Sequence, residues 1–406
     1  MRRVAVVASH PIQYQAPWFR GLAEVCDLTV WFCHQQSAAE QGRAGFGQAF
    51  EWDVPLADGY RSLWLKNVSS RPGVDRRAGC DTPEIRERLA RGSFEACVVN
   101  GWYLKSYQQA ISACRALGIP VLVRGDSHLK VRRSALTSAV KYFPYRWMLG
   151  RIDAHLYVGQ ANADYLRHYG VRPARMFFAP HFVDNDRFAA AAAKARRDGA
   201  ASALRHTWGA SEKDTLFQFV GKLIDLKRVQ DFVVAVARAS RQDPAIKGVV
   251  VGSGPEEPAL RRLAVRERAP VTFAGFMNQT ELPTGYAAAD CLVLPSATES
   301  WGLVVNEAMA TGMPAIVSNR VGAGPDLIVE GVTGHTYPAG DFDELAKRLL
   351  RVRRSFAGSC EGFRAAVLER IGRYTCGQAV AGTLRAIDAT SRAVARTPAV
   401  VESKHA

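Results

Sequence analysis

Short apolar runs alternate with amphipathic segments along almost the entire chain. Residues 4–8, for example, are all apolar and precede segment 18–25, in which apolar side chains recur every three or four positions. A continuous apolar run of this length is typical of a buried parallel strand, and the second pattern is typical of a helix that covers one face of a sheet. The alternation therefore predicts an α/β fold built on doubly wound parallel sheets.

The same patterns place the other elements and leave two segments unassigned. We expect further strands at residues 28–33, 96–100, 121–124, 154–159, 216–220, 248–251, 271–274, 291–295 and 314–318. We expect helices at 83–91, 104–117, 130–150, 161–168, 229–239, 282–289, 303–310, 341–354, 363–371 and 376–396. Segment 37–80, rich in Gly, Ser, Arg and aromatic residues, is predicted to be an irregular, partly mobile insertion. The Ala- and Arg-rich segment 188–205 is a predicted hinge.

Length and composition limit the number of domains and the classes of partner. The 406 residues are enough for two or three domains, and the net charge of +15 suits an acidic substrate, an anionic membrane face or nucleic acid without choosing among them. A solvated basic surface is the ordinary alternative. The eight cysteines form no CxxC pair, which favours a reducing compartment. The first apolar run is too short for a signal peptide, and no run is long enough for a membrane-spanning helix.

The segment 298–312 (TESWGLVVNEAMATG) carries the most informative chemistry. It follows a predicted strand and places Glu299 in a loop, Gly302 at a helix start and Glu307 eight positions after the first carboxylate. A helix that begins at such a loop directs free N–H groups at it, which makes an anion site. The two carboxylates could then accept hydrogen bonds from sugar hydroxyls on either side. Alternatively, Glu307 is a solvated residue of the helix face and Glu299 acts only near the helix dipole.

Other loops that follow predicted strands add candidates. Lys222 and Lys227 come directly after a strand and Gly221, as if to meet a diphosphate. Gly252 opens a glycine-rich turn, GSGP, which either lets the backbone approach a ligand or simply turns tightly.

Two loops in the first half are acceptor-side candidates, because open α/β sheets bind ligands at the carboxyl ends of their strands. The first loop contains His10, Gln13 and Tyr14, and the second contains Asp126, which could orient a hydroxyl, and His128, which could hydrogen-bond a sugar. The alternatives are a hydrogen-bonded His10 and a local pair between Arg124 and Asp126 that closes a turn.

The predicted helix 130–150 interleaves basic and aromatic residues. Such a helix can lie on an anionic membrane. The alternative is a packed connecting helix whose charges face water.

Taken together, several motifs carry a family resemblance. They are GKLIDLK at 221–227, GSGP at 252–255, VTFAGF at 271–276, PSATESWGLVVNEAMATGMPAI at 295–316 and GPDLIVEGVTG at 324–334. In this order and spacing they resemble family 4 glycosyltransferases of the GT-B type, which transfer sugars from nucleotide donors with retention. The first half is similar at SHPIQYQAPWFR and VGQANADYLRHYGV.

The resemblance implies two facing Rossmann-like domains. These would be an acceptor-binding domain at 1–185 and a nucleotide-sugar-binding domain at 186–375, with helix 376–396 returning to the first domain and a loose tail at 397–406. Two positions depart from the family pattern. Lys222 stands where the family usually has Arg, and His10 occupies a loop that commonly holds a glycine pair.

It also implies roles for individual residues. Glu299, Lys222 and Lys227 would be catalytic, with the lysines neutralising the diphosphate and Glu299 holding the donor sugar, while Glu307 would hold the ribose. The remaining donor-site residues would be Gly221, Gly252, Gly275, Phe276, Ser300, Trp301, Gly302, Leu303 and Val304.

The function that this resemblance implies is transfer from a UDP- or GDP-sugar to a glycan, lipid-linked or polysaccharide hydroxyl. No metal, no further cofactor and no nucleic acid would take part. The protein would be cytoplasmic, with peripheral association at the inner membrane face. An epimerase or phosphorylase of the same fold, or a non-catalytic subunit that binds nucleotide sugars, stays an alternative.

Overall fold

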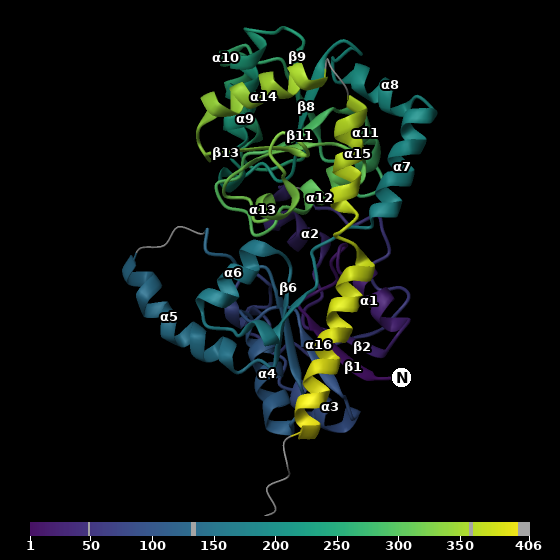
Figure 1. The fold of residues 1–406 in the computed structure, drawn as a ribbon, viewed down its shortest axis with the longest axis vertical. Coiled ribbons are helices and arrows are strands. Elements are labelled where there is room, and N and C mark those ends of the chain that lie inside the picture. Colours follow the sequence, from purple (N-terminus) through teal and green to yellow (C-terminus); the bar gives the residue numbers. More distant parts are fainter. Residues whose placement is uncertain (48, 131–134, 357–359, 397–406) are drawn as a thin grey trace, which may run out of the picture.

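A computed structural model describes residues 1–47, 49–130, 135–356 and 360–396. These residues form two parallel sheets, of seven and six strands, stacked as two lobes along the long axis of the molecule (Figure 1). The predicted tail 397–406 and the first turn of the predicted helix 130–150 lie outside the described residues.

The first sheet has the strand order β3-β2-β1-β4-β5-β6-β7. Its strands are β1 Arg3–Ala8, β2 Asp27–Phe32, β3 Arg61–Trp64, β4 Ala96–Val99, β5 Val121–Gly125, β6 Ala154–Tyr157 and β7 Met176–Phe178. The helices between them are α1 Ala16–Ala23, α2 Ala38–Gln41, α3 Ile85–Gly92, α4 Lys105–Leu117, α5 Ala135–Gly150 and α6 Gln160–His168. The inner strands are buried on both faces, as continuous apolar runs require.

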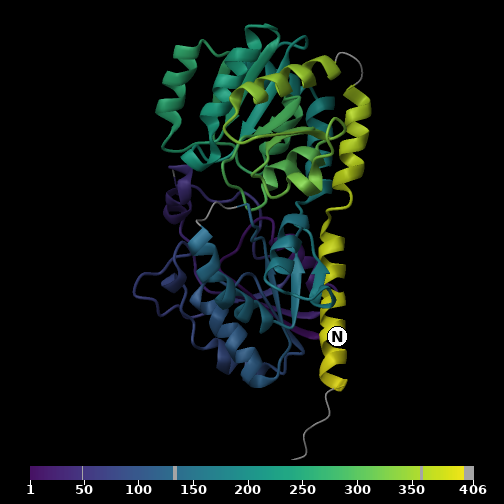
Figure 2. The same cartoon turned by 60° about the vertical axis from the view of Figure 1, so that its left-hand side comes forward.

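The second sheet has the order β10-β9-β8-β11-β12-β13. Its strands are β8 Thr215–Val220, β9 Ile246–Val251, β10 Val271–Gly275, β11 Cys291–Leu294, β12 Ala315–Ser318 and β13 Gly334–Tyr337. Its helices are α7 Asn185–Arg197, α8 Ala200–Thr207, α9 Val229–Ser240, α10 Glu257–Glu267, α11 Leu282–Ala288, α12 Leu303–Ala310, α13 Gly324–Leu327, α14 Phe342–Phe356 and α15 Cys360–Ile371. The long helix α16, Cys376–Arg396, then packs on α1, β6 and β7 of the first sheet, and Figure 2 shows it following α15 along one side of the molecule.

The prediction for segment 37–80 was wrong in part. It contains α2, a π-helical turn at Gly42–Phe46 and the edge strand β3, which pairs in parallel with β2. Only four residues of β3 join the ladder, and its side chains are not fully buried, so the strand lacks a continuous apolar run.

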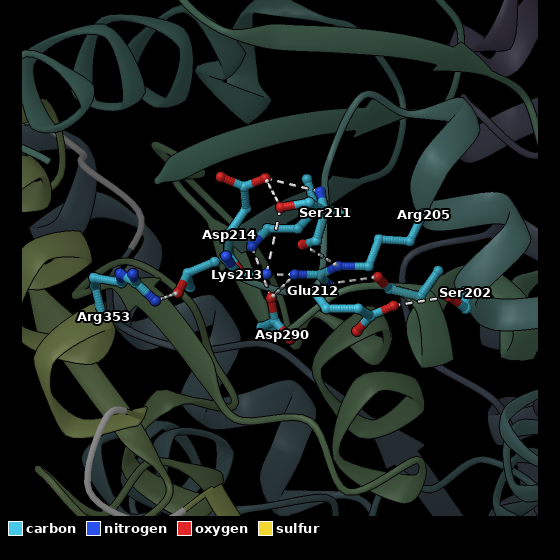
Figure 3. Close-up of polar contacts among 11 residues, drawn as sticks. Ser202, Arg205, Ser211, Glu212, Lys213, Asp214, Asp290 and Arg353 are labelled. Carbon is cyan, nitrogen blue, oxygen red and sulfur yellow. Dashed lines mark hydrogen bonds and ion pairs between the residues drawn. The ribbon is translucent and has the colours of Figure 1, made fainter. Parts of the chain in front are cut away.

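The predicted hinge at 188–205 is helical and is fixed to the second lobe. Arg205, a buried residue of α8, donates hydrogen bonds to the carbonyl oxygens of Ser211, Asp214 and Ala288 and to Asp290 Oδ2 (Figure 3). These bonds tie α8 to the starts of β8 and β11. A buried guanidinium held in this way is costly to displace, so the segment is a rigid part of its lobe.

The chain crosses between the lobes twice, before α7 and before α16. The side-chain amide of Asn185 joins the two crossings, because its Nδ2 donates to the carbonyl oxygens of Ile371 at 3.4 Å and Tyr374 at 3.2 Å. The two connections therefore lie side by side. The exact domain boundaries stay a prediction.

Candidate active site

A cavity of about 380 Å³ lies where the strand ends of the two lobes face each other. Most of the candidates that the sequence suggested line it. They are Gln13, Tyr14, Asp126, Gly221, Lys222, Lys227, Gly252, Phe276, Glu299, Ser300, Trp301, Gly302, Leu303, Val304 and Glu307. The carboxyl ends of strands from both sheets thus converge on one space, as open α/β sheets favour.

Three candidates do not line the cavity. The ring of His10 lies 3.0 Å from the Ser9 hydroxyl, and burial together with nearby His34 lowers the pKa of His10 to about 4. His10 is therefore a hydrogen-bonded loop residue, as the alternative interpretation has it. Gly275 belongs to the second sheet, where its carbonyl accepts a hydrogen bond from the Gly252 N–H at 2.7 Å.

His128 is the third, because its loop contacts the second lobe. Its Nδ1 accepts from the Lys130 N–H at 3.1 Å, which leaves Nε2 to donate to the Glu299 carbonyl at 3.0 Å. Both ring nitrogens are thus engaged, and the imidazole is buried. Its position fixes the backbone of the Glu299 loop and does not face the acceptor side.

The amino terminus of α12 opens on the cavity. Gly302 precedes the helix with φ at +100°, and a Cβ there would lie 2.9 Å from the Leu294 side chain, so only glycine fits without strain. The N–H groups of Leu303 and Val304 belong to the first turn, which has no intrahelical acceptors. The helix dipole and these N–H groups make this end of the cavity electropositive.

Lys227 and Glu299 form an ion pair at this end. The Lys227 ammonium contacts Glu299 Oε2, and the Ser296 hydroxyl donates to the same oxygen at 3.2 Å. Both side chains are largely buried. The backbone of Glu299 is held from the other side by the Gly322 N–H at 3.0 Å. The Glu299 side chain is therefore held at the cavity by its partners, and its role there stays a prediction.

Lys222 lies beside this pair. Burial, and secondarily the charge of Lys227, hold the pKa of Lys222 below its usual value of 10.5, while Glu299 acts in the opposite direction. Its ammonium is 5.0 Å from the ring centroid of Phe46, within the range of a cation–π contact. Two cations therefore share one half of the cavity, where an anionic group would relieve their repulsion.

Glu307 faces the cavity from the second turn of α12. Its residue is only 5% exposed, so the alternative of a solvated helix-face residue is wrong. Tyr286 donates its hydroxyl to Glu307 Oε2 at 2.7 Å, and Gln279 donates to Oε1 at 3.3 Å. Burial raises the pKa of Glu307 against these two hydrogen bonds, which lower it. A carboxylate acceptor with free lone pairs is thus held at a fixed place.

On the opposite wall, Asp126 is placed by a chain of buried groups. Arg124 stacks over Trp18 at 4.9 Å and donates to Pro180 O at 2.8 Å. Its guanidinium is engaged by these contacts and does not form the local ion pair with Asp126. His181 Nδ1 lies 3.3 Å from Arg124 Nη2 and accepts from it, and His181 Nε2 then faces Asp126 Oδ2 at 3.9 Å. Burial lowers the pKa of His181 to about 4, so the ring is neutral at pH 7.

Sequence reasoning missed two aromatic residues of the cavity, Phe46 and Trp52, both from the first lobe. The ring centroid of Phe46 lies 5.4 Å from that of Phe276, and the Phe46 carbonyl accepts from the Ser253 hydroxyl at 2.7 Å. Phe50 packs on Phe276 at 4.8 Å. The only signal was the cluster of aromatic residues in an otherwise polar segment.

Contacts beside the cavity hold the lobes together. The carboxylate of Asp326, in the second lobe, lies at the amino terminus of α6 in the first and accepts from the Gln160 N–H at 2.9 Å. The Trp301 indole donates to Asn306 Oδ1 at 2.7 Å, and Asn306 in turn donates to the His181 carbonyl at 3.3 Å. The loop that carries Glu299 is thus fixed on both lobes.

Comparison with known proteins gives the class of enzyme. Residues 202–355 match the family model described as glycosyl transferases group 1. An alpha-D-kanosaminyltransferase of Streptomyces kanamyceticus is 27% identical over 248 residues, covering 59% of this chain and 62% of that protein. A D-inositol 3-phosphate glycosyltransferase of Saccharomonospora viridis is 29% identical over 387 residues, covering 86% of each chain. The chain is a glycosyltransferase.

Solved structures agree on the fold of this glycosyltransferase. A glycosyltransferase from Rickettsia africae superposes with a TM-score of 0.72 at 11% identity, covering 98% of this chain and 99% of that one. HepE of Anabaena, solved in complex with UDP, gives 0.70 at 15% identity, covering 95% and 100%. The predicted GT-B fold of two Rossmann-like domains is confirmed.

The matched residues of the glycosyltransferase include the donor-side candidates Lys222, Lys227, Glu299 and Glu307. Across the described parts of the chain, no helix combines the length and the apolar character that crossing a bilayer requires. Within the same residues, no three His, Cys, Asp or Glu side chains gather in a group that could hold a metal ion.

Proposed function

We propose that this glycosyltransferase, as a member of family 4, moves a sugar from a UDP- or GDP-sugar to a hydroxyl of a glycan, polysaccharide or lipid-linked acceptor. The transfer retains the anomeric configuration and uses no metal ion or further cofactor. One observation carries the proposal. Lys222, Lys227, Glu299 and the amino terminus of α12 line a single cavity between the two lobes.

The charges and side chains of the cavity favour one orientation of the proposed donor. Its diphosphate lies against Lys222, Lys227 and the first N–H groups of α12, where positive charge is concentrated. The ribose hydroxyls donate to Glu307, whose carboxylate is fixed by Tyr286. The sugar hydroxyls donate to Glu299. The base then lies toward Phe276. The UDP found in the structure of HepE, which shares the fold, supports this class of donor.

The chemistry follows from the charge that develops on the leaving group. The bond between the anomeric carbon and the diphosphate oxygen breaks, and the acceptor oxygen forms the new bond on the same face of the sugar. The departing phosphate oxygen takes the acceptor proton. The two ammonium groups and the helix dipole stabilise the growing negative charge, the task that a divalent ion performs elsewhere.

Same-face attack is favoured by the states of the three cavity carboxylates. Glu299 is paired with Lys227, and Glu307 is held by Tyr286. Asp126 comes from the acceptor-side lobe, where it can orient the attacking hydroxyl. Because each carboxylate has another partner or task, we assign none of the three as a covalent nucleophile.

The net charge supports the proposed acceptor classes without choosing among them. A net charge of +15 suits a polyanionic glycan or a lipid-linked acceptor at an anionic membrane, and we place the protein in the cytoplasm with peripheral association at the inner membrane face.

The test is a panel of nucleoside diphosphates and their sugars, screened first by thermal shift. A donor at about 100 times its Kd should stabilise the protein by about 2.7 kcal/mol. Product formation from the donor that binds is then compared with Lys227→Ala and Glu299→Ala, each of which should lose about a hundredfold or more of kcat while staying folded. A sugar epimer or a sugar phosphate as product would identify an epimerase or a phosphorylase instead. Unchanged turnover in both variants would refute the site.

A further inference from the structure

Helix α5 shows an apolar stripe on its outward face. Leu136, Val140, Phe143 and Trp147 are 75%, 66%, 75% and 64% exposed. Their spacing of four, three and four positions places all four side chains on one side of an α-helix. Figure 1 shows α5 at the outer edge of the first lobe, away from both sheets. The stripe therefore faces solvent as one continuous line.

The opposite face of α5 is firmly attached. Tyr142 and Tyr145 pack against Tyr169, with ring centroids 5.7 and 5.5 Å apart, and Leu149 is fully buried in the core of the first lobe. The helix thus has one partner already, and the exposed stripe is a second apolar face. Single exposed apolar residues are ordinary, whereas a contiguous line of four usually marks an interaction surface.

A basic groove lies beside the stripe. A cavity of about 490 Å³ separates α5 from α4, and its walls include Trp102, Tyr103 and Trp147. Three arginines and no carboxylate line it, namely Arg77, Arg115 and Arg151. The Arg151 guanidinium stacks on the Trp147 ring at 4.2 Å, which joins the groove to the stripe.

The sequence of α5 and its flanking residues carries charge of a single sign. Between positions 130 and 152 the sequence contains six lysines and arginines and no aspartate or glutamate. A protein partner at this surface would need an acidic rim to match these charges, because interfaces place potentials of opposite sign against each other. An anionic lipid surface instead offers phosphates to the cations and acyl chains to the apolar line, and tryptophan prefers this boundary.

We infer that the outward face of α5 and the adjoining arginine groove dock the enzyme on an anionic phospholipid bilayer. The helix lies in the plane of the interface, with Phe143 and Trp147 inserted among the lipids and Arg77, Arg115 and Arg151 at the phosphates. This inference rests on the proposed function for the location of its acceptor. The surface itself is separate from the donor cavity, so the two can fail independently.

The test is co-sedimentation of the full chain with phosphatidylcholine vesicles that contain or lack phosphatidylglycerol. We expect binding only to the anionic vesicles, weakened by salt. The pair Phe143→Ser and Trp147→Ser should lower the partition coefficient by about tenfold or more, because it removes two inserted aromatic side chains. Arg77→Gln with Arg115→Gln should lower it by about fivefold for each charge removed.

Matched controls distinguish binding through this surface from non-specific binding to vesicles. Val25→Ser with Val265→Ser removes two exposed apolar side chains elsewhere, one of them 80% exposed on α10, and should bind vesicles as the unaltered protein does. Lys227→Ala should also bind normally while losing turnover, and the serine pair should keep donor binding and its melting temperature.

Three results would overturn the inference. The first is equal binding of the serine pair and the unaltered chain, and the second is equal binding to neutral and anionic vesicles. The third is a dimer in solution that the serine pair converts to a monomer, which would make the stripe an interface between two copies of the chain.

Discussion

The backbone N–H of Gln160 in the first lobe lies 3.0 and 2.9 Å from the two carboxylate oxygens of Asp326 in the second. Tyr374 donates its hydroxyl to Asp326 Oδ1 at 3.1 Å, and the residue is buried. A carboxylate at the start of α6 gains from the helix dipole as well as from the hydrogen bonds. This contact holds the two lobes together beside the cavity.

Asp326→Ala should therefore favour an open arrangement and weaken donor binding by about tenfold, since a hydrogen bond to a charged group contributes about 1.5–3 kcal/mol. Calorimetry gives the donor Kd, and small-angle scattering gives the radius of gyration, which should rise. Gln160→Ala is the matched control, because it keeps the N–H that the carboxylate contacts. An unchanged radius and Kd in Asp326→Ala would show that the contact does not hold the lobes together.

The lowered pKa of Lys222 gives a pH dependence. Burial brings its pKa below 10.5, so the free enzyme loses this positive charge at a lower pH than an exposed lysine would. The kcat/KM for the donor should then fall with rising pH through that lowered pKa, because kcat/KM reports the free enzyme. Lys222→Arg, which stays charged, should move this alkaline limb upward. Identical profiles for the two proteins would assign the limb to another group.

The buried carboxyl of Glu307 should cost stability when no donor is bound. Its pKa in the folded protein is raised above the usual 4.5, so its ionised form is disfavoured by folding. Below pH 4.5 the carboxyl is protonated in both states and costs nothing. The cost builds up as pH rises above 4.5 and is complete above the folded pKa.

Glu307→Gln should therefore melt at a higher temperature than the unaltered protein at pH 8, with the gap narrowing toward pH 5. Its donor affinity should nevertheless fall by about tenfold, since a charged acceptor is lost. Scanning calorimetry across this range checks both the sign and the trend. Glu87→Gln, an exposed glutamate on α3, should show no such gap. A gap that widens toward pH 5 would contradict the sign.

Phe46 should influence the donor KM. Its ring packs against Phe276 and under the Lys222 ammonium, so Phe46→Ala removes a wall of the cavity from the opposite lobe. We expect the KM for the donor to rise by about tenfold, with a smaller change in kcat and in melting temperature. Trp64→Ala, an exposed aromatic of β3, is the control in steady-state assays. An unchanged KM would place the base elsewhere.

Periodicity and length predicted much of the fold. The buried strands read as continuous apolar runs, and helices such as Leu303–Ala310 and Cys376–Arg396 begin and end where the pattern indicates. The edge strand β3 was missed because its side chains are only partly covered. Helix α10 was not predicted, because it buries only Leu260 and Ala264 and otherwise carries charge.

The site residues that directly follow a strand could be predicted from the sequence, because the loops after parallel strands all lie at the same edge of the sheet. Lys222, Lys227 and Glu299 were found in this way. Phe46 and Trp52 could not be, since they reach the cavity from the other lobe through a segment without periodicity. His128 was predicted as a cavity residue and is not one. Only the folded chain shows that its imidazole is hydrogen-bonded to the Glu299 backbone.

The amide of Asn185 has a mechanical consequence. Its two hydrogen bonds join the neighbouring connections between the lobes, so a twist about one connection alone would break them. A relative movement of the lobes that keeps both hydrogen bonds is therefore a rotation about the edge where the two connections lie.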